Sequence, residues 1–353
     1  MPWGFHPESL HGGDSAAMLG GRHGIGYAWE AATEPTEVWA THIMLLAGGL
    51  LILVGGGECL VRGAAQLARQ MGVSALVVGL TIVAFGTSAP ETAVSMQSAA
   101  TGHDALAVAN AVGSCIMNIL LVLGVAALAR PLRVSRNVLR TDAPFMVFFT
   151  AVFMLFAIDD QEIDRWQGLF FVIAIVFYTL ATYFEAHRQP AIVEDEYEHD
   201  PRQHPRSWYL NIGAILIGIV GLVKGADLIV EGAVGIAHIL GITERIIGLT
   251  VVAFGTSLPE LATCVIAARR NQPDIAIGNI VGSNIFNILA VIGLTATVFP
   301  LHVNRETVFL DAPVMLGAAV LLIPILRTGR RVGRWEGVLL LALFAGYLAW
   351  MLW

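Results

Sequence analysis

Long apolar runs separated by short polar loops dominate the chain from about residue 39 to its end. These runs follow neither the alternation of a half-buried strand nor the stripe of an amphipathic surface helix. A helix that crosses the hydrocarbon layer of a bilayer needs about 20 such residues. The pattern therefore predicts an all-α membrane protein with ten spans, over residues 39–68, 73–100, 105–129, 139–158, 166–186, 208–240, 246–268, 275–299, 308–326 and 335–353.

Two polar segments flank or divide these spans. Residues 1–38 are rich in Gly, His and Ala and lack the charged start and short apolar run of a secretory signal peptide. We predict that they form a flexible tail that faces outward. Residues 187–207 contain three prolines and a run of acidic residues, which predicts a polar linker.

The chain contains an internal repeat with a constant offset of 169 residues. Residues 79–95 read GLTIVAFGTSAPETAVS, and residues 248–264 read GLTVVAFGTSLPELATC, so twelve of seventeen positions are identical. The same offset aligns residues 110–118 (NAVGSCIMN) with residues 279–287 (NIVGSNIFN). One register kept over more than a hundred residues indicates a duplicated unit.

Each unit holds five of the predicted spans, in residues 39–186 and 208–353. An odd number of spans makes the second copy enter the membrane from the opposite side. If the N-terminus lies outside, fifteen arginines fall on the cytoplasmic side and four on the outer side, as the positive-inside rule requires. The sequence thus predicts two inverted five-helix repeats in the cell (inner) membrane, with the 187–207 linker in the cytoplasm and both termini outside. Inverted repeats are typical of secondary transporters.

Composition and charge support a membrane-embedded chain. Hydrophobic residues make up 56% of the sequence, charged residues only 13%, and mean hydropathy is +0.71. The arginines are scattered over short loops, so nucleic-acid binding is not expected, and no protein partner is evident; the lipid bilayer is the expected environment. The three cysteines lie in apolar spans and read as small core residues, because no disulfide or zinc spacing is present.

Two acidic residues, Glu91 and Glu260, lie near the middle of the second and seventh spans. Charged side chains at membrane depth are costly and mark ion pathways by default. Each ends the motif Phe-Gly-Thr-Ser-x-Pro-Glu. Because Pro lacks an N–H and Gly loosens the chain, we predict that both helices break at GTSxPE. The carbonyls freed by such breaks are tolerated where they line a cavity.

The spans that follow add neutral oxygens. Ser114 and Asn118 are four residues apart on one helical face, and Ser283 and Asn287 repeat this spacing. The hydroxyls of the two broken helices belong to Thr87, Ser88, Thr256 and Ser257. Ligands that are all oxygen suit hard cations such as Ca²⁺ and Na⁺ and argue against zinc, copper or nickel. We expect these ions as transported substrates, with no cofactor and no catalytic residue.

Structural roles compete with these assignments. A Gly-Thr-Ser-x-Pro kink can serve helix packing alone, with hydroxyls bonded back to carbonyls. We interpret Asp142 and Asp311, each before an Ala-Pro at the start of a span, as helix-capping residues. Lys224 and Asp227 are three residues apart and are expected to pair. Glu58, the counterpart of Asp227, is interpreted as a pairing residue as well.

At its two motifs the sequence resembles the cation/calcium exchanger superfamily, most closely the prokaryotic sodium/calcium exchanger branch. The resemblance covers about residues 40–353. It implies a ten-helix fold whose second, third, seventh and eighth helices hold the ions while the first and sixth slide past them. Glu91 and Glu260 would be central ligands shared by Ca²⁺ and Na⁺, and Thr87 and Thr256 would contribute carbonyls and hydroxyls. Flanking sodium sites would use Ser88, Ser257, Ser114, Ser283 and the carbonyls of Ala84 and Ala253.

Two departures from relatives matter. Some relatives carry Asp where Asn287 stands, and the potassium-coupled branch is similar in having an acid there. The linker is also too short to fold the large calcium-sensing domains of animal relatives. The resulting hypothesis is an antiporter, not an enzyme, that exchanges Ca²⁺ for Na⁺ by alternating access.

Three alternatives remain open at this point. A proton/calcium antiporter is the nearest, although that branch typically shows Gly-Asn-x-x-Glu instead of the hydroxyl-rich motif. A cation channel would usually build its filter from several subunits around one axis. An intramembrane hydrolase would need a His near the serines, and neither motif has one.

Overall fold

The structure is a computed structural model that describes residues 35–188, 207–241 and 253–351. Nearly all of the predicted tail (1–38), most of the 187–207 linker and the start of the predicted span 246–268 lie outside the described residues. The boundaries assigned to these segments therefore stay predictions.

The first repeat folds into helices joined by short turns. Several helices contain a π-helical segment (η), in which the backbone hydrogen bond skips one extra residue. Its elements are α1 (Pro35–Met71), α2 (Ala75–Val78), η2 (Gly79–Val83), α3 (Ala84–Thr87), α4 (Ala89–Ala100), α5 (Asp104–Met117), η3 (Asn118–Val122), α6 (Leu123–Ala129), β1 (Leu132–Arg133), η4 (Val138–Asp142), α7 (Ala143–Asp159), β2 (Glu162–Ile163) and α8 (Arg165–Arg188).

The second repeat has the same order of elements where it is described, except for one additional element, η8, which is a 3₁₀ turn and not a π-helical segment. They are α9 (Trp208–Ile239), α11 (Ala253–Thr256), α12 (Leu258–Arg269), α13 (Pro273–Phe286), η6 (Asn287–Ile292), α14 (Gly293–Val298), β3 (Leu301–His302), η7 (Thr307–Asp311), α15 (Ala312–Arg327), η8 (Thr328–Arg330), β4 (Arg331–Val332) and α16 (Arg334–Met351).

Seven helices of the described residues are long and apolar enough to cross a membrane, or eight if the bent pair 75–87 and 89–100 counts as one span. Exposed apolar side chains such as Leu51, Phe177 and Trp166 cover the outside of the bundle, as expected of a surface that faces lipid. The apolar window of the span Pro273–Val298 is completely buried, whereas 28% of the window in α1 is buried. The centre of the protein is therefore built around α13 and its counterpart α5.

The second span changes direction at the GTSxPE sequence. Helix α3 ends at Thr87 and α4 starts at Ala89, and the axis of residues 75–87 differs from that of residues 89–100 by 41°. Ser88 has φ −85° and ψ 7°, and Ser257, between α11 and α12, has φ −90° and ψ 3°. Pro90 and Pro259 lie in the first turn of the helix that follows, where a missing N–H costs least.

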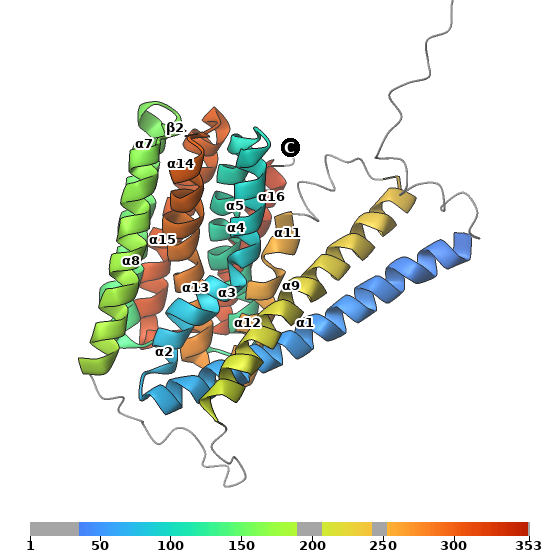
Figure 1. Cartoon of the computed structure of the whole chain (residues 1–353), viewed down its shortest axis with the longest axis horizontal. Helices are drawn as coiled ribbons and strands as arrows, with labels where there is room; N and C mark the ends of the chain where they lie inside the picture. Colours follow the sequence, from blue (N-terminus) through green and yellow to red (C-terminus); the bar gives the residue numbers. More distant parts are fainter. Residues whose placement is uncertain (1–34, 189–206, 242–252, 352–353) are drawn as a thin grey trace, which may run out of the picture.

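Two small antiparallel sheets, which the hydrophobic pattern did not predict, link the repeats. β1 pairs with β4, and β2 pairs with β3. At the offset of 169, β1 corresponds to β3 and β2 corresponds to β4. Exchanging the two repeats therefore converts one sheet into the other. The sheets lie at opposite ends of α15, and Figure 1 shows β2 at the end of the bundle where the chain finishes. Two copies related by an approximate twofold axis produce this arrangement.

Helices α1 and α9 form a slanted antiparallel pair beside the upright bundle (Figure 1). Glycines spaced by seven residues let their backbones approach closely. A Cβ on Gly225 would lie 2.5 Å from the backbone nitrogen of Leu53, and one on Gly218 would lie 2.6 Å from that of Leu60. Small residues have this role at helix contacts in membranes.

The capping role expected for Asp142 and Asp311 is wrong. Neither side chain caps its helix. The Tyr178 hydroxyl donates to Asp142 Oδ1 at 3.0 Å, and the Tyr347 hydroxyl donates to Asp311 Oδ1 at 2.9 Å. Because each helix continues from a π-helical turn, the N–H groups at its start already have carbonyl partners and need no cap. The predicted pair of Lys224 with Asp227 is confirmed at 3.1 Å.

Candidate cation site

Glu91 and Glu260 occupy equivalent positions in the first turn of α4 and of α12, and both side chains are fully buried. The N-terminus of a helix stabilises a nearby negative charge. The short helices α3 and α11 end just before these residues, and the C-terminal end of a helix favours a cation. The two breaks thus combine buried carboxylates with carbonyl-rich helix ends.

Hydroxyl groups connect the two carboxylates across the repeats. The Ser88 hydroxyl of the first repeat donates to Glu260 Oε1 of the second at 3.3 Å. The Ser114 hydroxyl on α5 donates to Glu91 Oε1 at 3.4 Å. Because Ser88 precedes Glu91 by three residues, the starts of α4 and α12 meet at one place. We call Glu91, Glu260 and the polar side chains around them the central site.

Thr87 joins the broken second span to α13. Its hydroxyl lies 3.4 Å from the Ser283 hydroxyl and 3.0 Å from Asn279 Oδ1. The same hydroxyl lies 3.3 Å from the carbonyl oxygen of Ala84, which also accepts the N–H of Ser88 at 3.0 Å. A hydroxyl has a single proton, and the Thr87 hydroxyl lies closer to Asn279 Oδ1 than to this carbonyl. The Ala84 carbonyl, proposed as a sodium ligand by resemblance, therefore accepts the Ser88 N–H and keeps its second lone pair.

Buried polar atoms without a partner, as judged over the part of the chain that the structure describes, are concentrated in the central site and at the starts of η3 and η6, the segments that contact α12 and α4. They include Oε2 of both Glu91 and Glu260, the hydroxyl of Ser257, and both amide atoms of Asn118 and of Asn287. A buried polar atom that makes no hydrogen bond costs about 1–3 kcal/mol. Several such atoms around two carboxylates match the ligand set of a hard cation.

The structure brings together most of the residues that the sequence singled out. Thr87, Ser88, Ser114 and Ser283 lie within hydrogen-bonding distance of one another or of a carboxylate. The other candidates are placed by their elements. Asn118 and Asn287 begin η3 and η6, Ser257 lies between α11 and α12, Thr256 ends α11, half-buried, and Ala253 is its first residue.

Sequence reasoning missed two asparagines next to the central site. Asn110 donates to the backbone carbonyl of Glu91 at 3.3 Å and to the Ser95 hydroxyl at 3.0 Å. Asn279 accepts from Thr87 and donates to Cys264 Sγ at 3.3 Å. The signal was available, because Asn110 lies four residues before Ser114 on the same helical face. Asn110 thus links α5 to α4, and Asn279 links α13 to α3 and α12.

Charge is unbalanced at this site. Isolated buried carboxylates are strongly disfavoured unless a cation or a proton neutralises them. The remaining side chains that contact the two glutamates are hydroxyls. Among the described residues, no group of three or more His, Cys, Asp or Glu side chains is placed to hold a metal ion. The arrangement can therefore bind cations through oxygen, with two negative charges to share among them.

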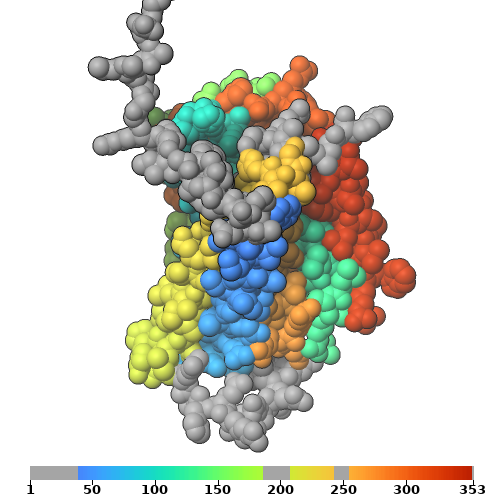
Figure 2. All heavy atoms as spheres, turned by 90° about the vertical axis from the view of Figure 1, so that its right-hand side faces the viewer, coloured from blue at the N-terminus to red at the C-terminus, as the bar shows by residue number. Residues whose placement is uncertain are grey.

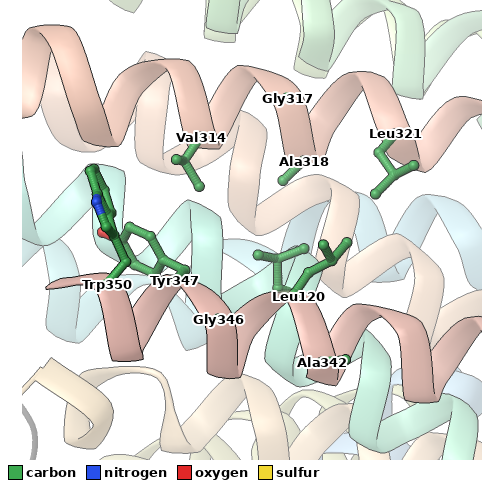
Figure 3. A pocket seen from close by; sticks show the side chains of 10 residues that line it. Leu120, Val314, Gly317, Ala318, Leu321, Ala342, Gly346, Tyr347 and Trp350 are labelled. Atoms are coloured by element: carbon green, nitrogen blue, oxygen red, sulfur yellow. The ribbon is translucent and has the colours of Figure 1, made fainter. Parts of the chain in front are cut away.

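One hollow on the described surface lies away from the central site and is apolar. It has a volume of about 480 Å³ between α15 and α16, with Gly317, Ala318 and Gly346 along its walls and Trp350 at one end (Figure 3). At the equivalent places the first repeat carries phenylalanines, among them Phe149, which pack ring against ring. The hollow carries no charged side chain, so it is no candidate for ion binding.

Comparison with protein families gives one assignment for both halves of the chain. The family described as "Sodium/calcium exchanger protein" matches residues 41–184 and again residues 210–353. The two matches coincide closely with the two repeats found in the sequence.

Curated relatives agree with this assignment. The sodium/calcium exchanger MaX1 of Methanosarcina acetivorans is 33% identical over 310 residues, covering 78% of this chain and 89% of the relative. The inner membrane protein YrbG of Escherichia coli K12 is 36% identical over 286 residues, covering 80% and 88%.

A solved structure shares the fold. The sodium–calcium exchanger NCX_Mj, in a structure soaked with Na⁺ and Sr²⁺, superposes with a TM-score of 0.77 at 31% identity. The match covers 88% of this chain and 99% of that one.

Proposed function

The chain belongs to the sodium/calcium exchanger protein family, and from this membership we propose that it is a secondary antiporter that exchanges Ca²⁺ for Na⁺ by alternating access. The observation that carries the proposal is the buried pair of carboxylates, one from each repeat, with a free oxygen on each. An apolar multi-pass protein keeps such a pair only if mobile cations neutralise it.

The proposed ligands follow from the geometry of the central site. Glu91 and Glu260 bind Ca²⁺ together, and the same two carboxylates bind Na⁺ when Ca²⁺ is absent. Ser88 and Ser114, which already contact the carboxylates, support flanking sodium sites together with their repeat counterparts. Asn118 supplies a neutral amide oxygen, as does its counterpart.

The shared charge explains why the ions take turns. Two carboxylates balance one Ca²⁺ or two Na⁺, so both loads cannot be held at once. The empty site carries two uncompensated charges in a low-dielectric interior, and its movement across the membrane is therefore disfavoured. Transport in one direction is then coupled to transport in the other.

The membrane arrangement is part of the proposal. The chain has ten spans, with the second and seventh broken, and both termini face the periplasm. Helices α1 and α9 slide as a pair over the bundle that holds the central site. In support, these two helices contact each other closely along their glycines, and a relative of similar length is named an inner membrane protein.

Proton coupling is the second candidate, because a proton can also neutralise a buried carboxylate. Purified protein in liposomes separates the two. We expect uptake of radiolabelled calcium when a sodium gradient is imposed, and none when a pH gradient of equal size replaces it. Uptake driven by the pH gradient alone, without sodium, would establish the proton antiporter instead.

A further inference from the structure

An ion pair joins the slanted pair of helices to the bundle at one end of the molecule. Arg270, at the end of α12, contacts Glu58 on α1 through Nη2 to Oε2 at 2.6 Å and through Nε to Oε1 at 3.1 Å. Two parallel contacts of this kind are the strongest geometry for an arginine–carboxylate pair. Arg62, one turn further along α1, also reaches Glu58 Oε2 at 3.1 Å.

Apolar packing accompanies this ion pair. Gly57, next to Glu58, lies directly against the side chain of Ile266 on α12. Ile266 lies one turn before Arg270 and is 8% exposed. In Figure 2 the lower part of α1 lies beside α12. At this end, the helix that follows Glu260 is therefore covered by α1.

The repeat predicts a matching contact at the other end, between α9 and α4, and the chain does not make it. At the offset of 169, Asp227 corresponds to Glu58 and Thr101 corresponds to Arg270. Asp227 pairs with Lys224 in its own helix. The Thr101 hydroxyl donates to carbonyls in the last turn of α4. Gln97, the counterpart of Ile266, is exposed.

In a protein made of two inverted copies, exchanging the conformations of the copies produces the state that faces the opposite side. If every contact had a counterpart, the two states would have similar free energies. A contact made in only one state shifts the equilibrium toward that state. The pair of Glu58 with Arg270 is such a contact, since residue 101 carries no charge.

We propose that the Glu58–Arg270 pair is a latch that keeps the central site closed at the end where α1 finishes and biases the protein toward opening at the opposite end. The latch must break once in each transport cycle. This inference rests on the proposed antiport by alternating access, but it concerns the balance of two conformations, which can be measured without transport.

The test measures accessibility at both ends. A cysteine is introduced at Ile266 or at Gln97 in a Cys59→Ser background, in which the remaining Cys115 and Cys264 are buried. It is alkylated with a membrane-impermeant maleimide applied from each side in turn. Arg270→Thr installs the residue of the other repeat and leaves Glu58 paired with Arg62. We expect it to raise the labelling rate of Ile266→Cys relative to Gln97→Cys about two- to fivefold, the range of a partly exposed ion pair.

Four further variants test whether the ion pair causes the shift. Glu58→Gln should give the same shift, and the double variant with Arg270→Thr should give no further shift, because the two residues act as one pair. Thr101→Arg, which offers Asp227 a partner at the opposite end, should move the labelling ratio the other way. Lys224→Gln breaks only an exposed pair within α9 and should leave the ratio unchanged.

Two results would overturn the latch. One is an unchanged ratio in Arg270→Thr, and the other is additive effects of Arg270→Thr and Glu58→Gln, which would mean that they act separately. Absence of sodium-driven calcium uptake by the wild-type protein would instead contradict the proposed function. Because labelling needs no ion gradient, the two failures are distinguishable.

Discussion

Replacing Glu91 or Glu260 by Gln removes one negative charge from the central site and leaves its shape nearly unchanged. Both side chains are fully buried, and each has an oxygen that no described group satisfies. We expect each substitution to abolish calcium transport while the protein still folds and inserts. Folding should survive because the change removes a buried charge rather than a packing contact.

The size of the effect follows from Coulomb's law. At an effective dielectric constant of about 20, two unit charges 4 Å apart interact by about 4 kcal/mol, so Ca²⁺ loses about 8 kcal/mol with one carboxylate. The repulsion between the two carboxylates is present with and without the ion, so it does not enter the binding affinity. A loss of about 8 kcal/mol lowers calcium affinity by far more than a thousandfold. A single Na⁺ loses only about 4 kcal/mol by the same law, so the larger loss should fall on calcium.

Two assays check this expectation. The first is sodium-driven uptake of radiolabelled calcium into proteoliposomes, with Glu162→Gln as the matched control, since Glu162 is an exposed acid at β2. The second is thermal unfolding of purified protein. Calcium at a hundred times its dissociation constant stabilises a binding protein by about 2.7 kcal/mol, and both glutamine variants should lose this stabilisation.

The reasoning would be refuted by near-normal calcium uptake in either variant once its expression is verified. Equal stabilisation of wild type and variants by calcium would refute it as well. Because the two glutamates come from repeats that face opposite ways yet share one site, both losses should be severe. A defect confined to one variant would mean that the site is not shared.

The remaining predictions concern topology, coupling and packing. Cysteines at His103 and Arg133, both exposed, should react with an impermeant maleimide from opposite sides, His103 from outside, as the inverted repeat requires. Because both carboxamides of the central site are neutral, calcium uptake should not require K⁺. Gly225→Ala places a Cβ 2.5 Å from a backbone nitrogen of α1 and should destabilise the protein by about 1–3 kcal/mol. Gly213→Ala, with open space around it, should be neutral or slightly stabilising. Tyr178→Phe removes the 3.0 Å hydrogen bond to the buried aspartate before α7 and should cost about 1–3 kcal/mol.

For each of these predictions, one experimental outcome would contradict it. Labelling of both cysteines from one side would contradict the inverted repeats. The first cysteine is placed at His103 rather than at the neighbouring Gly102, because the φ of 78° at Gly102 disfavours a side chain. A strict requirement for K⁺ would mean that a further cation is bound. Equal unfolding temperatures for the two glycine variants would contradict backbone contact between α1 and α9. An unchanged unfolding temperature in Tyr178→Phe would mean that water replaces the hydroxyl.

The sequence by itself determined the duplication, the helical membrane class and the identity of the central carboxylates. Each rests on covalent or local facts. A constant register needs only alignment, a span needs only about 20 apolar residues, and Glu91 stands out because a mid-span charge is costly wherever the helix packs. Cys115 and Cys264 are likewise buried, as their apolar surroundings predict.

Only the tertiary structure decided which polar atoms meet. The contact of Ser88 with Glu260 joins residues 172 positions apart, and no local pattern encodes such a distance. The sheets that link the repeats escaped prediction because their strands are two residues long. The predicted caps failed for a similar reason, since the partner of Asp142 is a tyrosine on another helix.

The ion pair of Glu58 with Arg270 shows the same division between sequence and structure. The sequence shows that Thr101 replaces the arginine in the other copy, but it does not show that α1 covers α12 at Ile266 while Gln97, the counterpart on α4, is exposed. The sequence determines the free-energy cost of a mid-span charge and the presence of the repeat, because both depend on the order of residues along the chain. Packing determines which side chains pair and where the contacts of the two repeats differ, because both depend on which helix faces are brought together in space.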